Sequence, residues 1–141
     1  MKKAIVLLSG GLDSATALYW ARAQGYRCHC LIFDYGQRHK KEIVHAKALA
    51  RQVKATFDVI RVSLPWAKAS SLTDVSQSLP DVVLSRIGRG GIPSTYVPGR
   101  NTLFVAFAIS AADALRAQAI VLGPNVLDYS GYPDCRPAFY Q

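Results

Sequence analysis

Cysteines and long apolar runs are scarce in this sequence, and each shortage excludes a class of protein. The three cysteines, Cys28, Cys30 and Cys135, do not suggest a disulfide framework. Neither a Cys-x-x-Cys nor a His-x-x-x-His spacing occurs, so we predict no metal ligands among the cysteines and histidines. We interpret Cys28 and Cys30 as small buried residues on one side of a strand. The apolar run after Lys3 is too short for a signal-peptide core or a membrane span, so we expect a cytoplasmic protein without a membrane partner.

Acidic side chains are also few: 9 Asp and Glu residues against 17 Lys and Arg residues give a net charge of +8. This excess favours polyanionic partners such as nucleotide phosphates, pyrophosphate or RNA. The basic residues form no dense run and no motif interleaved with aromatics, so we favour a site for small anions over direct nucleic-acid binding. With half of its 141 residues hydrophobic, the chain has the composition of a single folded domain.

The most informative stretch is the hexapeptide Ser-Gly-Gly-Leu-Asp-Ser at residues 9–14. It follows a short apolar run, typical of a buried parallel strand, and precedes a stretch rich in helix formers. Adjacent glycines let the backbone approach a ligand, and the next helix offers unpaired N–H groups and its positive dipole end, so we predict a phosphate site. The alternative is a plain tight turn with Asp13 or Ser14 as N-cap. No Gly-Lys-Ser/Thr follows, which excludes a Walker A loop.

Apolar periodicity predicts alternating strands and helices. Strands are expected over 4–8, 27–33, 57–62 and 119–122, and helices over about 14–24, 39–53 and 102–118. The first and third helices are apolar almost all round, which predicts that both are buried, and Asn101 is placed to cap the third. Charged residues within 57–62 predict a strand near the sheet edge. We interpret residues 63–98 as an active-site loop or lid, the alternative being a mobile loop without function.

The order of these elements predicts the fold and the place of the site. Strand, helix, strand, helix, strand, loop, helix and strand imply right-handed crossovers and an α/β, doubly wound parallel sheet of the Rossmann-like kind. We expect the strand order 3-2-1-4. The polar turns at 9–14, 34–37 and 123–125 each follow a strand, so they are predicted to meet at the carboxyl edge, where such sheets bind ligands.

The hexapeptide resembles the pyrophosphate loop (PP-loop) of the ATP pyrophosphatases, which split ATP between the α- and β-phosphates to adenylate a substrate. Three further segments resemble, in the same order, the 7-cyano-7-deazaguanine synthase (QueC) family of queuosine biosynthesis. They are Asp-Tyr-Gly-Gln-Arg-His at 34–39, Thr-Tyr-Val-Pro-Gly-Arg-Asn at 95–101 and Asp-Tyr-Ser-Gly-Tyr-Pro-Asp-Cys-Arg-Pro at 128–137. The resemblance runs along essentially the whole chain and implies an adenine nucleotide alpha hydrolase-like fold.

The resemblance also implies a reaction, an ATP-dependent ligation of 7-carboxy-7-deazaguanine and ammonia that yields 7-cyano-7-deazaguanine. The substrate carboxylate attacks the α-phosphate of ATP and releases pyrophosphate, and ammonia then displaces AMP to give the amide. A second ATP activates the amide oxygen, and loss of AMP leaves the nitrile. The implied cofactors are ATP and Mg²⁺, with zinc held by four cysteines in a further stretch of the family.

Roles for particular residues follow from the resemblance. Asp13 is expected to orient the loop or help hold Mg²⁺. Arg100 is a candidate for stabilising charge on the transferring phosphate, a structural salt bridge being the alternative. The candidates for recognising the deazapurine are Asp128, Tyr129, Tyr132 and Asp134. The expected nucleotide-binding segment consists of Leu8, Ser9, Gly10, Gly11, Leu12, Asp13, Ser14, Ala15, Thr16, Ala17 and Leu18.

The sequence departs from the family pattern at its end. Family members continue past the position of Gln141, so we expect the zinc cysteines and a last strand and helix to be missing, whether as a fragment, a degenerate copy or a shortened relative. Cys135 belongs to the 128–137 motif. The edge left open would favour association, so a homodimer is a candidate. Two alternatives to the ligase are another ATP pyrophosphatase, tRNA-thiolating or amide-forming, and a non-catalytic nucleotide-binding module.

Overall fold

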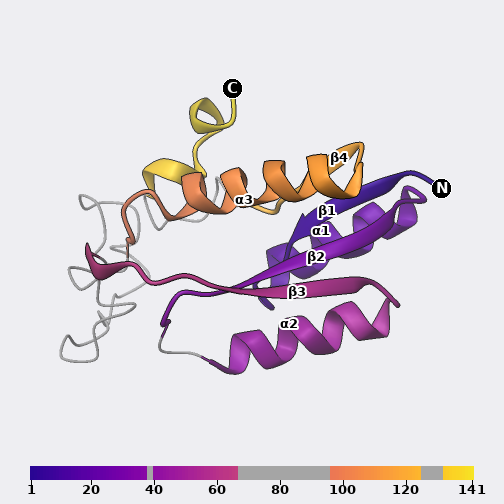
Figure 1. The fold of residues 1–141 in the computed structure, drawn as a ribbon, viewed down its shortest axis with the longest axis horizontal. Coiled ribbons are helices and arrows are strands. Elements are labelled where there is room, and N and C mark those ends of the chain that lie inside the picture. The colour runs from indigo at the N-terminus through magenta and orange to yellow at the C-terminus, as the bar shows by residue number, and fades with distance from the viewer. Residues whose placement is uncertain (38–39, 67–95, 125–131) are drawn as a thin grey trace, which may run out of the picture.

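Strands and helices alternate along the chain in the computed structural model, which describes residues 1–37, 40–66, 96–124 and 132–141. The predicted order of elements is confirmed (Figure 1). Two short 3-10 turns end the described chain, and none of the described helices has the length and hydropathy that a membrane span requires. The elements are β1 (Lys3–Leu7), α1 (Leu12–Ala23), β2 (Arg27–Asp34), α2 (Lys41–Gln52), β3 (Thr56–Arg61), α3 (Arg100–Leu115), β4 (Ala119–Val121), η3 (Pro133–Cys135) and η4 (Pro137–Phe139).

The four strands form a parallel sheet in the order β3-β2-β1-β4, as predicted. In register, Ala4 of β1 lies opposite Cys28 of β2 on one side and Ala119 of β4 on the other. β3 is an edge strand, which confirms the prediction made from its charged residues. The chain moves outward from β1 to β3 and then returns to the far side of β1. The loops after β1 and β4 therefore leave the sheet at a switch point, where a crevice opens at the carboxyl edge.

Helices cover both faces of the sheet (Figure 1). α1 and α2 pack on one face around Val6, Leu18 and Ala46, and both Cys28 and Cys30 are buried in this cluster, as predicted. α3 packs on the other face, where Ala108 meets Ile5, Leu31 and Phe33. The apolar positions of α2 recur every three to four residues and point to the sheet, because a helix on a sheet buries one stripe.

The prediction that α1 and α3 are buried all round is wrong. Trp20 of α1 is 54% exposed and Ile109 of α3 is 57% exposed, while Ala108 is the one residue of α3 that is fully buried. Within the described part of the chain, each of these helices packs on the sheet with one side only. Both helices therefore carry apolar side chains that the described part of the protein does not cover.

Two further expectations need correction or lie outside the described residues. Asn101 does not cap α3, because the helix begins at Arg100 and its N-cap is Gly99, a left-handed residue with φ +67°. Of the expected loop or lid at 63–98, the stretch 67–95 lies outside the described residues. Leu64 and Val97, which flank that stretch, pack together next to Tyr35.

Candidate active site

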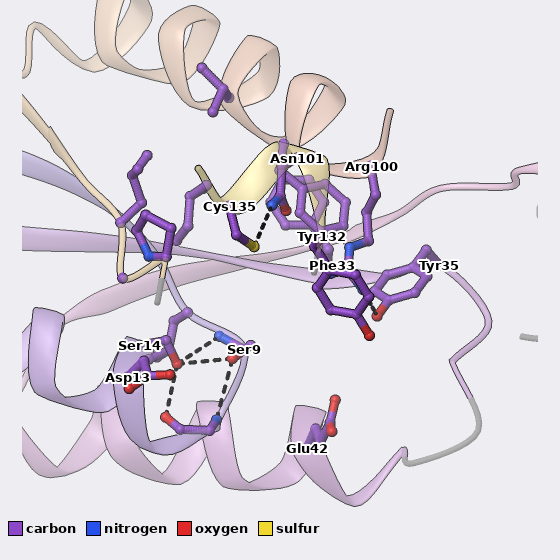
Figure 2. A pocket seen from close by; sticks show the side chains of 18 of the residues that line it. Ser9, Asp13, Ser14, Phe33, Tyr35, Glu42, Arg100, Asn101, Tyr132 and Cys135 are labelled. Atoms are coloured by element: carbon purple, nitrogen blue, oxygen red, sulfur yellow. Dashed lines mark hydrogen bonds between the residues drawn. The ribbon is translucent and has the colours of Figure 1, made fainter. Parts of the chain in front are cut away.

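A cavity of about 380 Å³ lies at the carboxyl edge of the sheet (Figure 2). Its walls come from the loops after β1, β2 and β4, the first turns of α3 and the C-terminal 3-10 turns. The predicted meeting of the polar turns at one edge is thus confirmed for their described members. A volume in this range accommodates a small organic ligand.

The hydroxyl of Ser14 organises the loop after β1. It donates to the carbonyl of Gly11 at 3.0 Å and accepts from the N–H of Ser9 at 3.2 Å. The hydroxyls of Ser9 and Ser14 are also 3.0 Å apart, and the N–H of Gly11 donates to the Ser9 hydroxyl at 3.3 Å. Ser14 is buried, so this ring of hydrogen bonds fixes the loop from its buried side. Ser9 remains exposed and lines the cavity.

The loop delivers the N-terminus of α1 to the cavity. The first helical hydrogen bond runs from Ala15 N to Gly11 O at 3.0 Å, so the N–H groups of Leu12, Asp13 and Ser14 precede the helical pattern. The N-cap is Gly11, without a side-chain capping bond, and the alternative that Asp13 or Ser14 caps the helix is wrong. Unpaired N–H groups and the positive end of the helix dipole make this end suitable for an anion.

The glycines of this region serve close packing. Gly10 has φ +89°, and a Cβ there would lie 2.3 Å from the carbonyl oxygen of Glu42 in α2. A Cβ on Gly11 would meet only the Ser9 hydroxyl, at 3.6 Å. Sequence reasoning missed the role of Gly123, where a Cβ would lie 2.6 Å from the carbonyl oxygen of Asp13. The loop after β4 therefore packs against the backbone of the first turn of α1. The only signal of this role in the sequence was a glycine directly after a predicted strand.

Arg100 and Tyr35 lie together on the far side of the cavity from the serines (Figure 2). Arg100 Nη1 donates to the Tyr35 hydroxyl at 3.0 Å, and the guanidinium carbon is 5.5 Å from the centre of the tyrosine ring. Burial raises the pKa of Tyr35, against a lowering by Arg100. Among the described residues, no carboxylate lies within ion-pair distance of Arg100, and its buried Nε has no hydrogen-bond partner. The structural salt bridge is therefore not found in this part of the chain.

Gln37 fixes the loop after β2 on which Tyr35 lies. Its side chain is only 5% exposed, accepts from Tyr35 N at 3.0 Å and donates from Nε2 to Phe33 O at 3.0 Å. Phe104 of α3 stacks on Phe33 with ring centres 3.9 Å apart. Sequence reasoning included Gln37 in a motif without a role. The signal that could have indicated its role in fixing the loop was a polar side chain next to the loop glycine, Gly36.

The proposed substrate residues have separate positions. Tyr132 lines the cavity, and its ring lies 6.1 Å from that of Tyr96. Asp134 is buried behind the wall, where its Oδ2 accepts from Asn101 N at 3.3 Å. Asp128 and Tyr129 lie outside the described residues. The lining residues that sequence reasoning did not assign to the site include Phe33, Glu42, Phe104, Gly123, Cys135 and Tyr140.

The expected nucleotide-binding segment lines the cavity in its first half. The hydroxyl of Thr16 donates a hydrogen bond to Leu12 O at 2.9 Å, and Leu18 is buried in the core. In the described ranges, no three His, Cys, Asp or Glu side chains gather as a metal site would require. Members of the segment that line the cavity are Leu8, Ser9, Gly11, Leu12, Asp13 and Ser14. Members that do not line it are Gly10, Ala15, Thr16, Ala17 and Leu18.

The fold defines the class of the chain: an α/β protein with a parallel, doubly wound sheet and a glycine-containing loop after its first strand. NMN synthetase from Francisella tularensis superposes with a TM-score of 0.54 at 20% identity, over 84% of this chain and 44% of that one. A 4-thiouridine synthetase, solved with RNA and bound ATP, gives 0.53 at 19% identity, over 89% and 30%. An NH3-dependent NAD synthetase from Campylobacter jejuni gives 0.50 at 15% identity, over 83% and 45%. At these identities the likeness concerns the fold alone.

Sequence relatives define the family. The family model described as queuosine biosynthesis protein QueC matches residues 3–141, and the chain belongs to this family. It is 51% identical to the 7-cyano-7-deazaguanine synthase of Alcanivorax borkumensis and 49% identical to that of Hydrogenovibrio crunogenus. These matches cover 100% and 99% of this chain but 62% and 59% of the relatives. The chain thus spans about three-fifths of their length.

Proposed function

We propose that this chain carries the ATP site of a 7-cyano-7-deazaguanine synthase, which joins ammonia to 7-carboxy-7-deazaguanine and ends at the nitrile. The observation that supports it best is that one cavity is lined by the serine-glycine loop, by Tyr35 and Arg100, and by Tyr132. These residues come from the four segments that carry the family resemblance. A reaction that adenylates an acid needs an anion site for the leaving pyrophosphate and a cation near the reacting phosphate.

The loop after β1 is proposed to hold the β- and γ-phosphates of ATP, which supplies the adenylyl group. The N–H groups of the first turn of α1 and the exposed hydroxyl of Ser9 are suitable donors, and Ser14 keeps the loop in shape. The exposed carboxylate of Asp13 lines the cavity, which suits Mg²⁺, a cation commonly held by one or two carboxylates and phosphate oxygens.

Arg100 is proposed to stabilise the negative charge that develops at the α-phosphate. Its guanidinium carries a full charge with no carboxylate within ion-pair distance in the described chain, so that charge is available to a ligand. Tyr132 is proposed to stack on the deazapurine, because its ring lines the same cavity. Asp128 and Tyr129 remain predicted contacts of the deazapurine. Asp134 is proposed to act indirectly, through its hydrogen bond to Asn101 N in the first turn of α3.

Several finer expectations remain predictions. They are ammonia as the nitrogen donor, the absence of a nucleic-acid partner, self-association and a cytoplasmic location. Zinc does not fit the described residues, which gather no suitable ligands, so no role is derived for it.

The proposal is tested by incubating the protein with ATP, Mg²⁺, ammonium and 7-carboxy-7-deazaguanine, then measuring AMP and the nitrile by mass spectrometry. We expect AMP formation that depends on the acid, and nitrile formation that also depends on ammonium. Arg100→Ala should lower AMP formation about a hundredfold, whereas Arg27→Ala, at the opposite end of the sheet, should leave it unchanged. ATP binding without acid-dependent AMP would support the nucleotide-binding module instead, and no ATP binding would overturn the loop assignment.

A further inference from the structure

The contact between Tyr35 and Arg100 carries an inference that builds on the proposed function. We propose that Tyr35 is a positioning residue, whose hydroxyl holds Nη1 of Arg100 and leaves the Nε edge of the guanidinium for an oxyanion of the reacting molecules. The hydrogen bond is 3.0 Å long and joins residues 65 apart in sequence, one after β2 and one at the start of α3.

The hydrogen bonding of Arg100 supports an oxyanion subsite. Its Nε is buried and unpartnered among the described residues, and no carboxylate there is within ion-pair distance. A buried donor without an acceptor destabilises the protein, and a bound ligand that accepts from it would remove that cost. Nε and one terminal nitrogen of an arginine form a side-on fork that matches carboxylate or phosphate oxygens. Because Nη1 already donates to Tyr35, the side-on fork is the pair of donors that remains for a ligand.

The surroundings of Tyr35 make it a fixed support. Gln37 is buried and bridges Tyr35 N and Phe33 O, which holds the loop against the end of β2. The Tyr35 ring also contacts Phe104, with ring centres 5.6 Å apart. Phe104 belongs to α3, as Arg100 does, so the hydroxyl is placed relative to both elements. Because Gln37 fixes the backbone of Tyr35 and Phe104 contacts its ring, the tyrosine hydroxyl has a fixed position, which limits the orientations of the Arg100 guanidinium.

A tyrosine suits this task better than a carboxylate would. An Asp or Glu at the same place would pair with Arg100 and neutralise its charge before any ligand bound. The tyrosine hydroxyl accepts the hydrogen bond while neutral, and burial raises its pKa, so it keeps its proton at neutral pH. The arginine is therefore oriented while its positive charge remains available to the oxyanion.

Kinetics test the coupling. Tyr35→Phe keeps the ring and removes the hydroxyl, and it should lower kcat for AMP formation about tenfold, since misplacement of a charged group weakens catalysis. Its thermal unfolding midpoint should stay near that of the parent. In the Arg100→Ala background the same substitution should have no further effect, because the group it positions is gone. Additive losses in the double variant would overturn the proposal.

Chemical rescue provides a second measurement. Guanidinium added to Arg100→Ala should restore part of the activity, because Tyr35 can hold the free cation. In Tyr35→Phe with Arg100→Ala the rescue should be at least several times weaker. Equal rescue in both backgrounds would show that the hydroxyl does not hold the guanidinium and would overturn the proposal.

A spectroscopic test does not depend on turnover. In protein with ¹⁵N-labelled arginine, the Nε–H signal missing from Arg100→Ala identifies the group, and in Tyr35→Phe it should shift and exchange faster. A non-hydrolysable ATP analogue and 7-carboxy-7-deazaguanine, each added alone, distinguish phosphate from carboxylate as the oxyanion by which one moves the signal. A signal indifferent to Tyr35→Phe, or to both ligands, would overturn the inference. A parent protein that makes no AMP would instead remove the proposed function while this signal could still be tested.

Discussion

Asp134 and Asn101, 33 residues apart, hold each other by two hydrogen bonds at the start of α3. Asp134 Oδ2 accepts from Asn101 N at 3.3 Å, and Asn101 Nδ2 donates to Asp134 O at 3.2 Å. The carboxylate from the C-terminal segment thereby satisfies an N–H group that the helix itself leaves unpaired. Tyr140 adds a hydrogen bond from its hydroxyl to Asp134 O at 3.0 Å. This arrangement ties the C-terminal turns to the cavity wall that carries Arg100.

Asp134→Ala should destabilise the protein by about 1–2 kcal/mol, the usual cost of losing a helix cap. Asp134→Asn keeps an oxygen acceptor but loses the charge favoured at a helix N-terminus, so its effect should be smaller. Urea unfolding followed by circular dichroism measures both. Asp113→Asn, exposed near the C-terminal end of the same helix, is the control and should be neutral or slightly stabilising. Equal losses for the Asp134 and Asp113 variants would contradict the capping role.

Gly10→Ala should cost several kcal/mol of stability and weaken ATP binding as α2 is displaced. The added Cβ would lie 2.3 Å from backbone of Glu42 at a position with φ +89°, and backbone cannot swing aside as a side chain can. Gly11→Ala is the matched control, because its Cβ has 3.6 Å of space to the Ser9 hydroxyl and its φ is −83°. Thermal unfolding separates the two variants, and an equal loss of stability in both would argue against close packing at Gly10.

Ser14→Ala should weaken ATP binding about tenfold, with a modest loss of stability. The variant removes the hydroxyl that joins Ser9 and Gly11, so the loop loses its fixed shape before a ligand arrives. Isothermal titration with ATP and Mg²⁺ gives the affinity. Ser110→Ala, on the exposed side of α3, supplies the control for a lost hydroxyl. Unchanged affinity for the Ser14 variant would indicate that the ring of hydrogen bonds is not needed for binding.

Stability should fall as the pH rises from 9 to 12 because of Cys30. Burial raises the pKa of this thiol from 9.0 to about 12, so the folded protein retains a proton that the unfolded chain releases within that range. The full contribution, on the order of 4 kcal/mol, is present below pH 9 and is lost as the pH approaches the folded-state pKa. Cys30→Ala should flatten the slope of unfolding free energy against pH in this window. An unchanged slope in the Cys30→Ala variant would exclude the thiol as the cause.

Much of the fold could be read from local sequence because its signals are local. Short apolar runs and periodic helices gave the parallel sheet and its edge strand, and the loop at 9–14 was placed correctly at the sheet edge. The burial of α1 and α3 was overestimated, because hydrophobicity does not say how many sides of a helix are covered. Asn101 was misassigned as the N-cap of α3 because the helix begins one residue earlier than predicted, and the side chain that binds its N–H, that of Asp134, lies 33 residues away.

By itself, the sequence determined the order of strands and helices, the place of the serine-glycine loop at the sheet edge and the family, all of which rest on residues close together in the chain. The tertiary structure decided which distant residues share the cavity: Tyr35 with Arg100, Gly123 against Asp13, and Asp134 with Asn101. Such pairs are set by the way β2, β4 and α3 converge at one edge, which no local pattern encodes. The physical reason is that hydrogen bonds and close packing depend on separations of a few ångströms, whereas sequence patterns fix only the type of element.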